Sequence, residues 1–356
     1  MKDEAIIDLA KRFKENPLIS PSDVKPTSSE MKVEGILNPG VFSFNRKIWL
    51  LIRVAERPIQ KEGYVSLPIY DAEGDIEILK FKKNDPDLDL KDPRVIRYKG
   101  NDYLPTLSHL RLMCSDDGKE FYQPEDYHPI FGEDPLEAYG IEDCRITEIN
   151  GIYNLTYTMV SSYGVGVGLM QTRDWKRFER KGMIFPPHNT DCAVFENKIW
   201  DRYFALHRPS SAQLGGNYIW IAQSPDLIHW GRHHCLAVTR PGMWDSARIG
   251  AGCSPIRTPK GWIVIYHGAD ETQRYCLGVL LLDLDDPGHV IARSESPIME
   301  PTEEYELKGL LGNVVFTNGH IVVGDKIKLY YGASDQVICG AEFSIEEILH
   351  TLSVQH

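Results

Sequence analysis

Two carboxylates and an arginine stand at the start of an apolar, strand-like segment. In GIEDCRITEING, residues 140–151, the side chains of Glu142, Asp143 and Arg145 lie between apolar residues. Asp143 beside Arg145 supplies a carboxylate in a polar setting, as a group that transfers a proton in catalysis requires. Asp143 is therefore the first candidate for chemistry in this chain.

Further polar residues follow apolar runs in distant parts of the chain. They are Arg53, Arg57, Ser161, Ser162, His207, Arg208, His267, Asp270, Ser334 and Asp335, with Asn189, Asp191, Asp245 and Arg248 on segments between them. Any one of these could be a solvated loop residue. As a set they recur at equivalent strand ends, and buried charges normally have partners or ligands. We therefore expect them to converge on one site.

The charges in this set have two chemical uses. Arg208, Arg248 and His267 suit an anion such as phosphate. An acid and an anion site facing one sugar would serve phosphorolysis, in which phosphate attacks the anomeric carbon while the leaving oxygen is protonated. A hydrolase would instead need a second carboxylate to activate water, across about 6.5–9.5 Å in the inverting case. Asp191 and Asp245 are the candidates for that base.

Aromatic residues near the same loops could pack on the apolar faces of a sugar ring, and core packing is the alternative for each. They are Tyr163, Trp244, Tyr266, Tyr275 and Tyr331.

Five similar strand-like openings predict the architecture that positions these groups. They are KIWLLIRVAE (47–56), GIYNLTYTMVS (151–161), DRYFALHRPS (201–210), GWIVIYHGAD (261–270) and DKIKLYYGAS (325–334). Most are followed by a second apolar strand, and three of these second strands by a loop with an aspartate. We predict an all-β fold, a five-bladed β-propeller over residues 34–356, with a short C-terminal helix at SIEEILHTL. A two-sheet sandwich would not explain five similar openings.

Residues 1–33 are predicted to form an N-terminal helical extension. Ile6, Ile7, Ala10 and Phe13 would lie on one face of an amphipathic helix. Because the propeller core would be complete without this face, we expect it to dock on a neighbouring subunit and make a homo-oligomer.

Composition limits the class of protein. The 356 residues carry a formal net charge of −12, which argues against nucleic acid or an anionic membrane as partner. No apolar run approaches the length of a membrane span, and the N-terminus lacks a signal-peptide core. Seven cysteines without paired spacing fit buried thiols in a reducing compartment. We expect a soluble cytoplasmic protein without a metal site.

A family resemblance sharpens these expectations. The motifs EDCRIT, HRPS, SPDLIHWG, RIGAG, GWIVIYHG, GVLLLDLDDP and YYGASD occur in this order between about residues 34 and 350. Together they resemble glycoside hydrolase family 130, the mannoside phosphorylases and related β-mannosidases. The resemblance implies a five-bladed propeller that cleaves β-mannosides with inversion and releases α-mannose 1-phosphate. Asp143 would be the general acid, acting through a sugar hydroxyl, and Arg145 would orient it.

The resemblance also implies ligand residues. Asn38, Arg53 and Asp335 match sugar-binding positions, and we add Arg145, Asn189 and Asp191 to the substrate site. Arg208, His267 and Tyr275 match phosphate ligands, and Arg248 replaces the family's lysine. Inorganic phosphate would be the co-substrate, and no cofactor is expected.

One departure leaves alternatives open. Thr190 stands where a further basic residue is common, and some relatives that lost basic groups are hydrolases. Other departures favour β-1,2-linked manno-oligosaccharides over β-1,4-linked ones. The alternatives are an inverting β-1,2-mannosidase and a non-catalytic carbohydrate-binding propeller.

Overall fold

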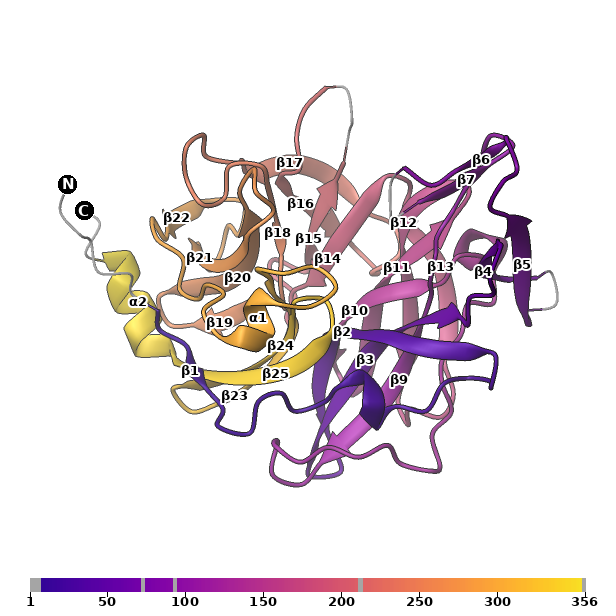
Figure 1. Ribbon diagram of the computed structural model, residues 1–356. Coiled ribbons are helices and arrows are strands. Elements are labelled where there is room, and N and C mark those ends of the chain that lie inside the picture. Colours follow the sequence, from indigo (N-terminus) through magenta and orange to yellow (C-terminus); the bar gives the residue numbers. More distant parts are fainter. Residues whose placement is uncertain (1–7, 72–73, 92–94, 211–213, 354–356) are drawn as a thin grey trace, which may run out of the picture.

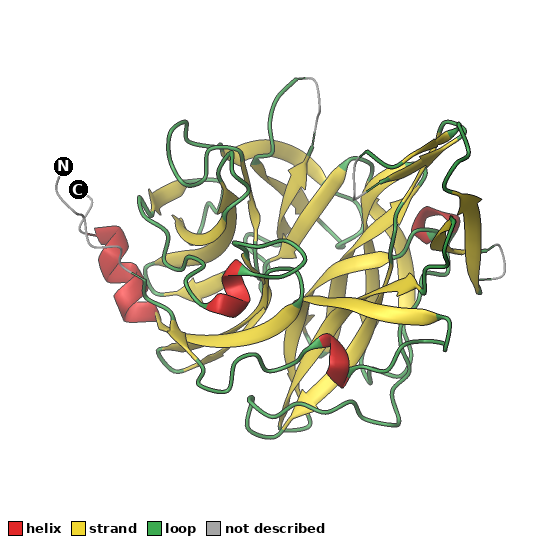
Figure 2. Cartoon of the chain, in the orientation of Figure 1, coloured by secondary structure: helices red, strands yellow, loops and turns green. Residues whose placement is uncertain are grey.

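The computed structural model describes residues 8–71, 74–91, 95–210 and 214–353, and they are almost entirely β-structure (Figures 1 and 2). The helical segments are η1 (Pro21–Asp23), η2 (Pro135–Glu137), α1 (Glu304–Leu307) and α2 (Ile345–Ser353). The last of these confirms the predicted C-terminal helix. None of the helices in the described ranges has the length and apolar character to cross a membrane. All seven cysteines are free thiols, and six of them are buried.

Most strands belong to five antiparallel sheets, which we name after their first strands β2, β10, β14, β18 and β23. The β2 sheet contains β2 (Met31–Phe44), β3 (Lys47–Pro58) and β9 (Leu107–Ser115). The β10 sheet contains β10 (Ile141–Ile149), β11 (Ile152–Ser161), β12 (Gly164–Thr172) and β13 (Glu179–Phe185). The β14 sheet contains β14 (Asn189–Val194), β15 (Tyr203–Pro209), β16 (Ile219–Ser224) and β17 (Gly231–Ala237).

The remaining strands complete the other two sheets and an insertion. The β18 sheet contains β18 (Arg248–Ala251), β19 (Ile256–Thr258), β20 (Gly261–Ala269), β21 (Tyr275–Leu282) and β22 (Val290–Arg293). The β23 sheet contains β23 (Val315–Val323), β24 (Lys326–Ala333), β25 (Val337–Ser344) and the short β1 (Lys11–Arg12). Between β3 and β9 lie two small sheets, of β4 (Tyr64–Tyr70) with β5 (Ile76–Lys82), and of β6 (Leu88–Asp89), β7 (Ile96–Tyr98) and β8 (Asn101–Tyr103).

The five openings found in the sequence fall one in each sheet. They correspond to β3, β11, β15, β20 and β24, and each pairs with the first strand of its sheet. The predicted aspartate loops also share one structure. The Asp174 and Asp226 carboxylates each accept two backbone N–H groups within the turn that follows the third strand of their sheet. The repeated sequence plan is therefore a repeated antiparallel unit.

Five hydrophobic clusters hold the sheets together, and each lies between two of them. Four lie between sheets that follow one another in the chain. The fifth joins the β2 and β23 sheets, with Ile36 and Leu50 of one packed with Tyr330 and Ile338 of the other. Among the first strands, β10 contacts β2 and β14, β14 contacts β18, and β23 contacts β2 and β10. Polar groups at one end of these strands are therefore brought close together.

The predicted N-terminal helix is wrong over the residues that the structure describes, and Ile6 and Ile7 lie outside them. From residue 8 the chain is extended, and Lys11 and Arg12 pair with β25. The Phe13 ring packs against Tyr330 of the same chain, with ring centroids 6.2 Å apart. Tertiary pairing has overridden the local helical pattern. The described part of the segment completes its own β23 sheet, which removes the basis for docking by a helix; the oligomeric state stays a prediction.

A buried ion pair secures this segment, which gives a test of its role. The Arg12 guanidinium donates at 2.8 Å to Glu306, whose side chain has no exposed surface. Arg12→Met should lower the free energy of unfolding by about 3–5 kcal/mol, because it leaves a buried carboxylate unpaired. Lys11→Met, which breaks the exposed pair with Glu347, should cost at most about 1 kcal/mol. Urea unfolding compares the two, and equal losses would contradict the assignment.

Candidate active site

Matching irregularities in three first strands form the site. The pairing register shifts between Leu37 and Gly40 in β2, between Glu142 and Arg145 in β10, and between Thr190 and Ala193 in β14. At these bulges Asn38, Asp143 and Asp191 adopt φ values of 38°, 47° and 54°, in the left-handed region. A bulge re-aims a side chain out of the alternating pattern of a strand. All three side chains line one cavity.

The cavity has a volume of about 250 Å³ and collects many of the predicted site residues. Those on its wall are Asn38, Arg53, Asp143, Asp191, Arg208, Tyr275 and Asp335. Sequence reasoning did not select the other wall residues, which are Leu37, Glu142, Thr158, Val165, Thr190, Leu311, Val314 and Phe316. Glu142 had a signal, because it is the second carboxylate of the EDCR motif. The apolar wall residues carry no chemical signature that separates them from the core.

A network of donors holds the candidate acid. Asn38 Nδ2 donates to Asp143 Oδ1 at 3.1 Å, and Arg53 Nη1 donates to the same oxygen at 3.2 Å. Arg53 Nη2 reaches Glu142 at 2.6 Å, and Ser108 Oγ donates to that carboxylate at 3.0 Å. Within the described part of the chain, no hydrogen bond reaches Asp143 Oδ2. One carboxylate oxygen of Asp143 is thus fixed by two donors, and the other accepts none from the described residues.

Three carboxylates share Arg53. Burial raises the pKa of Glu142, partly offset by Arg53, and the charge of Asp143 raises it further. Burial also raises the pKa of Asp335 to about 6, with Arg53 opposing and the charges of Asp143 and Glu142 adding to the shift. Burial acts to lower the pKa of Arg53, but the carboxylates outweigh it and the pKa is raised. Burial and the like charges around a single cation therefore favour the protonated forms of Glu142 and Asp335 more than in water.

Cations surround Asp191 on the other side. Its Oδ2 lies 2.6 Å from Arg208 Nε and 3.3 Å from His267 Nε2, and its Oδ1 accepts from Arg145 Nη2 at 3.1 Å. Burial acts to raise the pKa of Asp191, but Arg208, His267 and Arg145 outweigh it and hold the pKa well below its usual range. A carboxylate held ionised in this way is a poor general base. The geometry therefore disfavours Asp191 as the base of a hydrolase.

Arg145 and Asn189 lie behind the cavity wall, which corrects their placement as direct substrate ligands. The Arg145 guanidinium is buried and donates to the carbonyl oxygens of Asp143, Ala251 and Gly252 at 3.2, 2.8 and 2.6 Å. It therefore holds the backbone of the bulge that carries Asp143. The Asn189 side chain lies 3.0 Å from His207 Nδ1, in a buried pair.

The other predicted anion ligands form two layers. Tyr275 is on the cavity wall, and Arg248 behind it donates from Nη1 to the Tyr275 hydroxyl at 3.0 Å. His267 is wholly buried, and its ring centroid lies 4.2 Å from that of Phe316. Burial lowers the pKa of His267, although Asp191 opposes the shift, so the imidazole is neutral at pH 7. Arg208 and Tyr275 are thus the groups that reach the cavity, with Arg248 and His267 supporting them.

Asp245 does not belong to the site, which corrects its candidacy as a base. Its buried carboxylate binds Arg240 at 2.8 Å, Arg293 at 2.6 Å and the Tyr266 hydroxyl at 2.8 Å, in a cluster outside the cavity lining. Tyr266 and Tyr331 are wholly buried core residues rather than sugar platforms. Among the five aromatics, Tyr275 lines the cavity and Tyr163 is 72% exposed.

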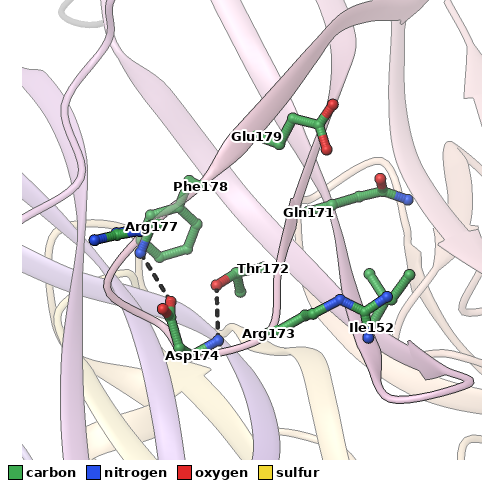
Figure 3. A pocket seen from close by; sticks show the side chains of 8 residues that line it. All are labelled: Ile152, Gln171, Thr172, Arg173, Asp174, Arg177, Phe178 and Glu179. Carbon is green, nitrogen blue, oxygen red and sulfur yellow. Dashed lines mark hydrogen bonds between the residues drawn. The ribbon is translucent and has the colours of Figure 1, made fainter.

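A second, wider hollow lies over the turn between β12 and β13 (Figure 3). Its polar groups are engaged locally: Asp174 accepts from the Arg177 backbone N–H at 2.9 Å, and Thr172 Oγ1 accepts from the Asp174 N–H at 3.3 Å. The Gln171 amide donates to Asn154 at 2.7 Å. These contacts stabilise a turn and bring no catalytic groups together.

A carboxylate cluster facing a group of cations across one cavity is the site of an enzyme acting on a polar substrate with an anionic partner. A family model described as beta-1,4-mannooligosaccharide phosphorylase matches residues 95–354. The chain belongs to this family, glycoside hydrolase family 130.

Named relatives give finer comparisons. The chain is 43% identical over 350 residues to a beta-1,2-mannobiose phosphorylase of Listeria innocua, covering 97% of this chain and 98% of the relative. A solved structure of the beta-1,2-mannobiose phosphorylase from Listeria innocua in complex with beta-1,2-mannobiose superposes with a TM-score of 0.93, covering 97% of this chain and 99% of the other. A 1,2-beta-oligomannan phosphorylase of Thermoanaerobacter is 39% identical over 249 residues, 68% of this chain and 80% of that protein.

The raised pKa of Asp335 gives a test of the carboxylate cluster. A carboxylic acid whose pKa is raised on folding stabilises the fold below its unfolded value of about 4, and this contribution is lost as pH rises through about 6. Asp335→Asn should therefore unfold at higher urea than wild type at pH 8, by about 1–3 kcal/mol, with the difference vanishing near pH 4. A difference that does not change with pH would contradict the cluster.

Proposed function

We propose that this protein is an inverting phosphorylase of β-1,2-linked manno-oligosaccharides that releases α-D-mannose 1-phosphate. The observation that carries the proposal is the division of one cavity into a side with Glu142, Asp143 and Asp335 and a side with Arg208 and Tyr275. The β-1,2 linkage is supported by the relatives that match most of the chain.

The mechanism assigns a task to each side. Asp143 supplies a proton, by way of a sugar hydroxyl as the family resemblance implies, to the oxygen of the leaving sugar. Phosphate, held by Arg208 and Tyr275 with Arg248 behind them, attacks the anomeric carbon from the opposite face. The bond from this carbon to the leaving oxygen breaks as its bond to phosphate forms, which inverts the configuration. Asn38, Arg53 and Asp335 would hold the sugar being transferred.

The five sheets would form the blades of a five-bladed propeller around this cavity. The cluster between the β2 and β23 sheets supports this, because it links the last sheet to the first as a ring requires. Phosphate would be the only co-reactant, and a cytoplasmic location would suit an enzyme that conserves bond energy as a sugar phosphate.

No observation favours the hydrolase over the phosphorylase. A water-activating base needs a carboxylate free to take a proton, yet Asp191 is held between the guanidinium groups of Arg145 and Arg208 beside the His267 ring, and Asp245 lies outside the cavity. Glu142 is paired with Arg53 at 2.6 Å. Incubation with β-1,2- and β-1,4-mannobiose, with and without phosphate, should yield mannose 1-phosphate only with phosphate and faster from the β-1,2 disaccharide. Release of mannose at full rate without phosphate would instead favour the alternative that the protein is a mannosidase.

Removing the acid should abolish turnover but not sugar binding. Asp143→Asn keeps the amide in place of the carboxylate and should lower kcat by about 10²–10⁴-fold, the usual contribution of a general acid. Calorimetry should still detect mannobiose. A near-normal kcat in a folded Asp143→Asn protein would show that Asp143 is not the general acid. Under the alternative of a non-catalytic binding protein, neither wild type nor variant would form product.

Removing the charge of Arg248 should weaken the binding of phosphate and leave the binding of the sugar nearly unchanged. Arg248→Ala should raise the KM for phosphate about ten- to a hundredfold, since it removes the hydrogen bond that holds the Tyr275 hydroxyl, and a hydrogen bond from a charged group contributes about 1.5–3 kcal/mol. The affinity for mannobiose should change little, because Arg248 lies on the cation side. Arg257→Ala, an exposed arginine of β19, is the matched control and should leave both constants unchanged. An unaltered phosphate KM in Arg248→Ala would remove Arg248 from the site.

A further inference from the structure

An exposed tyrosine stands on the rim of the cavity. Thr158 of β11 and Val165 of β12 line the cavity, and the turn that joins these strands carries Tyr163, whose side chain is 72% exposed. In the pairing register Thr158 lies opposite Glu142, and Ser161 opposite Gly164. The turn therefore extends three residues, or roughly 10 Å, beyond the level of the carboxylates.

The turn that presents Tyr163 is fixed in shape. The Tyr163 N–H donates to Ser161 Oγ at 3.2 Å, which closes the turn on itself. Gly164 has φ +107°, and a Cβ there would come within 2.6 Å of the His188 ring. Only glycine fits this backbone, so the neighbouring segment packs directly against the turn. The aromatic ring is thus held on a rigid support, which limits the entropy lost when a ligand packs on it.

Its position places Tyr163 on the side of the leaving sugar. The hairpin belongs to the same sheet as Glu142 and Asp143, whereas Arg208 and Tyr275, the proposed phosphate ligands, come from the β14 and β18 sheets. In an inverting displacement the acid serves the leaving oxygen and phosphate approaches from the opposite face. The part of the substrate that leaves must therefore extend past the acid, toward the β11–β12 turn.

We propose that Tyr163 forms a subsite for the leaving portion of the oligosaccharide, with its ring packed on the apolar face of a sugar. The inference rests on the proposed function. An exposed tyrosine ring gains from covering apolar sugar surface, and its hydroxyl can remain in water. Phosphate and the transferred sugar would take up the cavity of about 250 Å³, so the rest of a longer substrate would bind over this rim.

Trp200 provides a matched control. Its side chain is 77% exposed, but it lies in the connection from the end of β14 to the start of β15, whereas the cavity is formed at the start of β14 and the end of β15. Its ring N–H donates to the Asp285 carbonyl at 2.9 Å. A sugar bound in the cavity cannot reach it.

The experiment compares Tyr163→Ala, Tyr163→Phe and Trp200→Ala on β-1,2-mannobiose, mannotriose and mannotetraose. Tyr163→Ala should lower kcat/KM for at least the longer substrates by about three- to tenfold, because a lost aromatic contact is worth about 0.5–1.5 kcal/mol. Tyr163→Phe should retain most of the affinity, Trp200→Ala should match wild type, and the phosphate KM should not change. A loss that begins with mannobiose places the ring at the first leaving sugar, and one that begins with mannotriose places it at the next.

Equal kcat/KM values for wild type and Tyr163→Ala at every length would overturn the subsite, as would a loss accompanied by an equal rise in the phosphate KM. Binding of the same saccharides by calorimetry without phosphate separates the two proposals. If the wild type forms no mannose 1-phosphate, the proposed phosphorylase activity is wrong. Even then, weaker saccharide binding by Tyr163→Ala than by wild type and Trp200→Ala would support the subsite. Unchanged saccharide binding would exclude it.

Discussion

The buried ion pair between Arg145 and Asp191 holds both sides of the cavity in one geometry. The two side chains are 2% and 4% exposed, and removing such charges from water costs several kcal/mol per ion unless their hydrogen bonds are satisfied. Arg145 meets this condition through the carbonyl oxygens of the β10 bulge and of β18. Asp191 Oδ2 forms no hydrogen bond within the described residues, and the nearby Arg208 guanidinium balances its charge, with Nε 2.6 Å away. The acid side and the cation side are therefore coupled through a single guanidinium.

This coupling explains why the carboxylates and the guanidinium groups on opposite sides of the cavity do not pair directly across it. Arg53 forms ion pairs with Glu142 and Asp143, and the Asp191 carboxylate pairs with Nε of Arg208. Arg53 and Arg208 are thus each held by a carboxylate of their own side, and Arg208 Nη2 is oriented further by Thr190 Oγ1 at 3.1 Å. A preorganised site of this kind needs little rearrangement when an anion and a sugar bind.

Much of the architecture was predictable from the chain because it is repeated. Alternating apolar residues with a polar end recur five times, and each repeat became the second strand of a sheet. Asp143 and Arg208 were predictable for the same reason, since they stand beside such strands. The helix predicted for the N-terminal segment is wrong over the described residues, because its local preference for helix is weak. Pairing of Lys11 and Arg12 with β25 and packing of Phe13 against Tyr330 outweigh that preference.

The sequence by itself determined which residue types are present and the period at which strands and polar ends recur. Only the tertiary structure decided which charges face the cavity. Asp191 and Asp245 look alike in the sequence, yet one lies at a bulge beside the cavity and the other is enclosed by Arg240 and Arg293. Burial and partner choice depend on groups far apart in the chain, since the energy of a charge is set by its three-dimensional neighbours rather than by its adjacent residues.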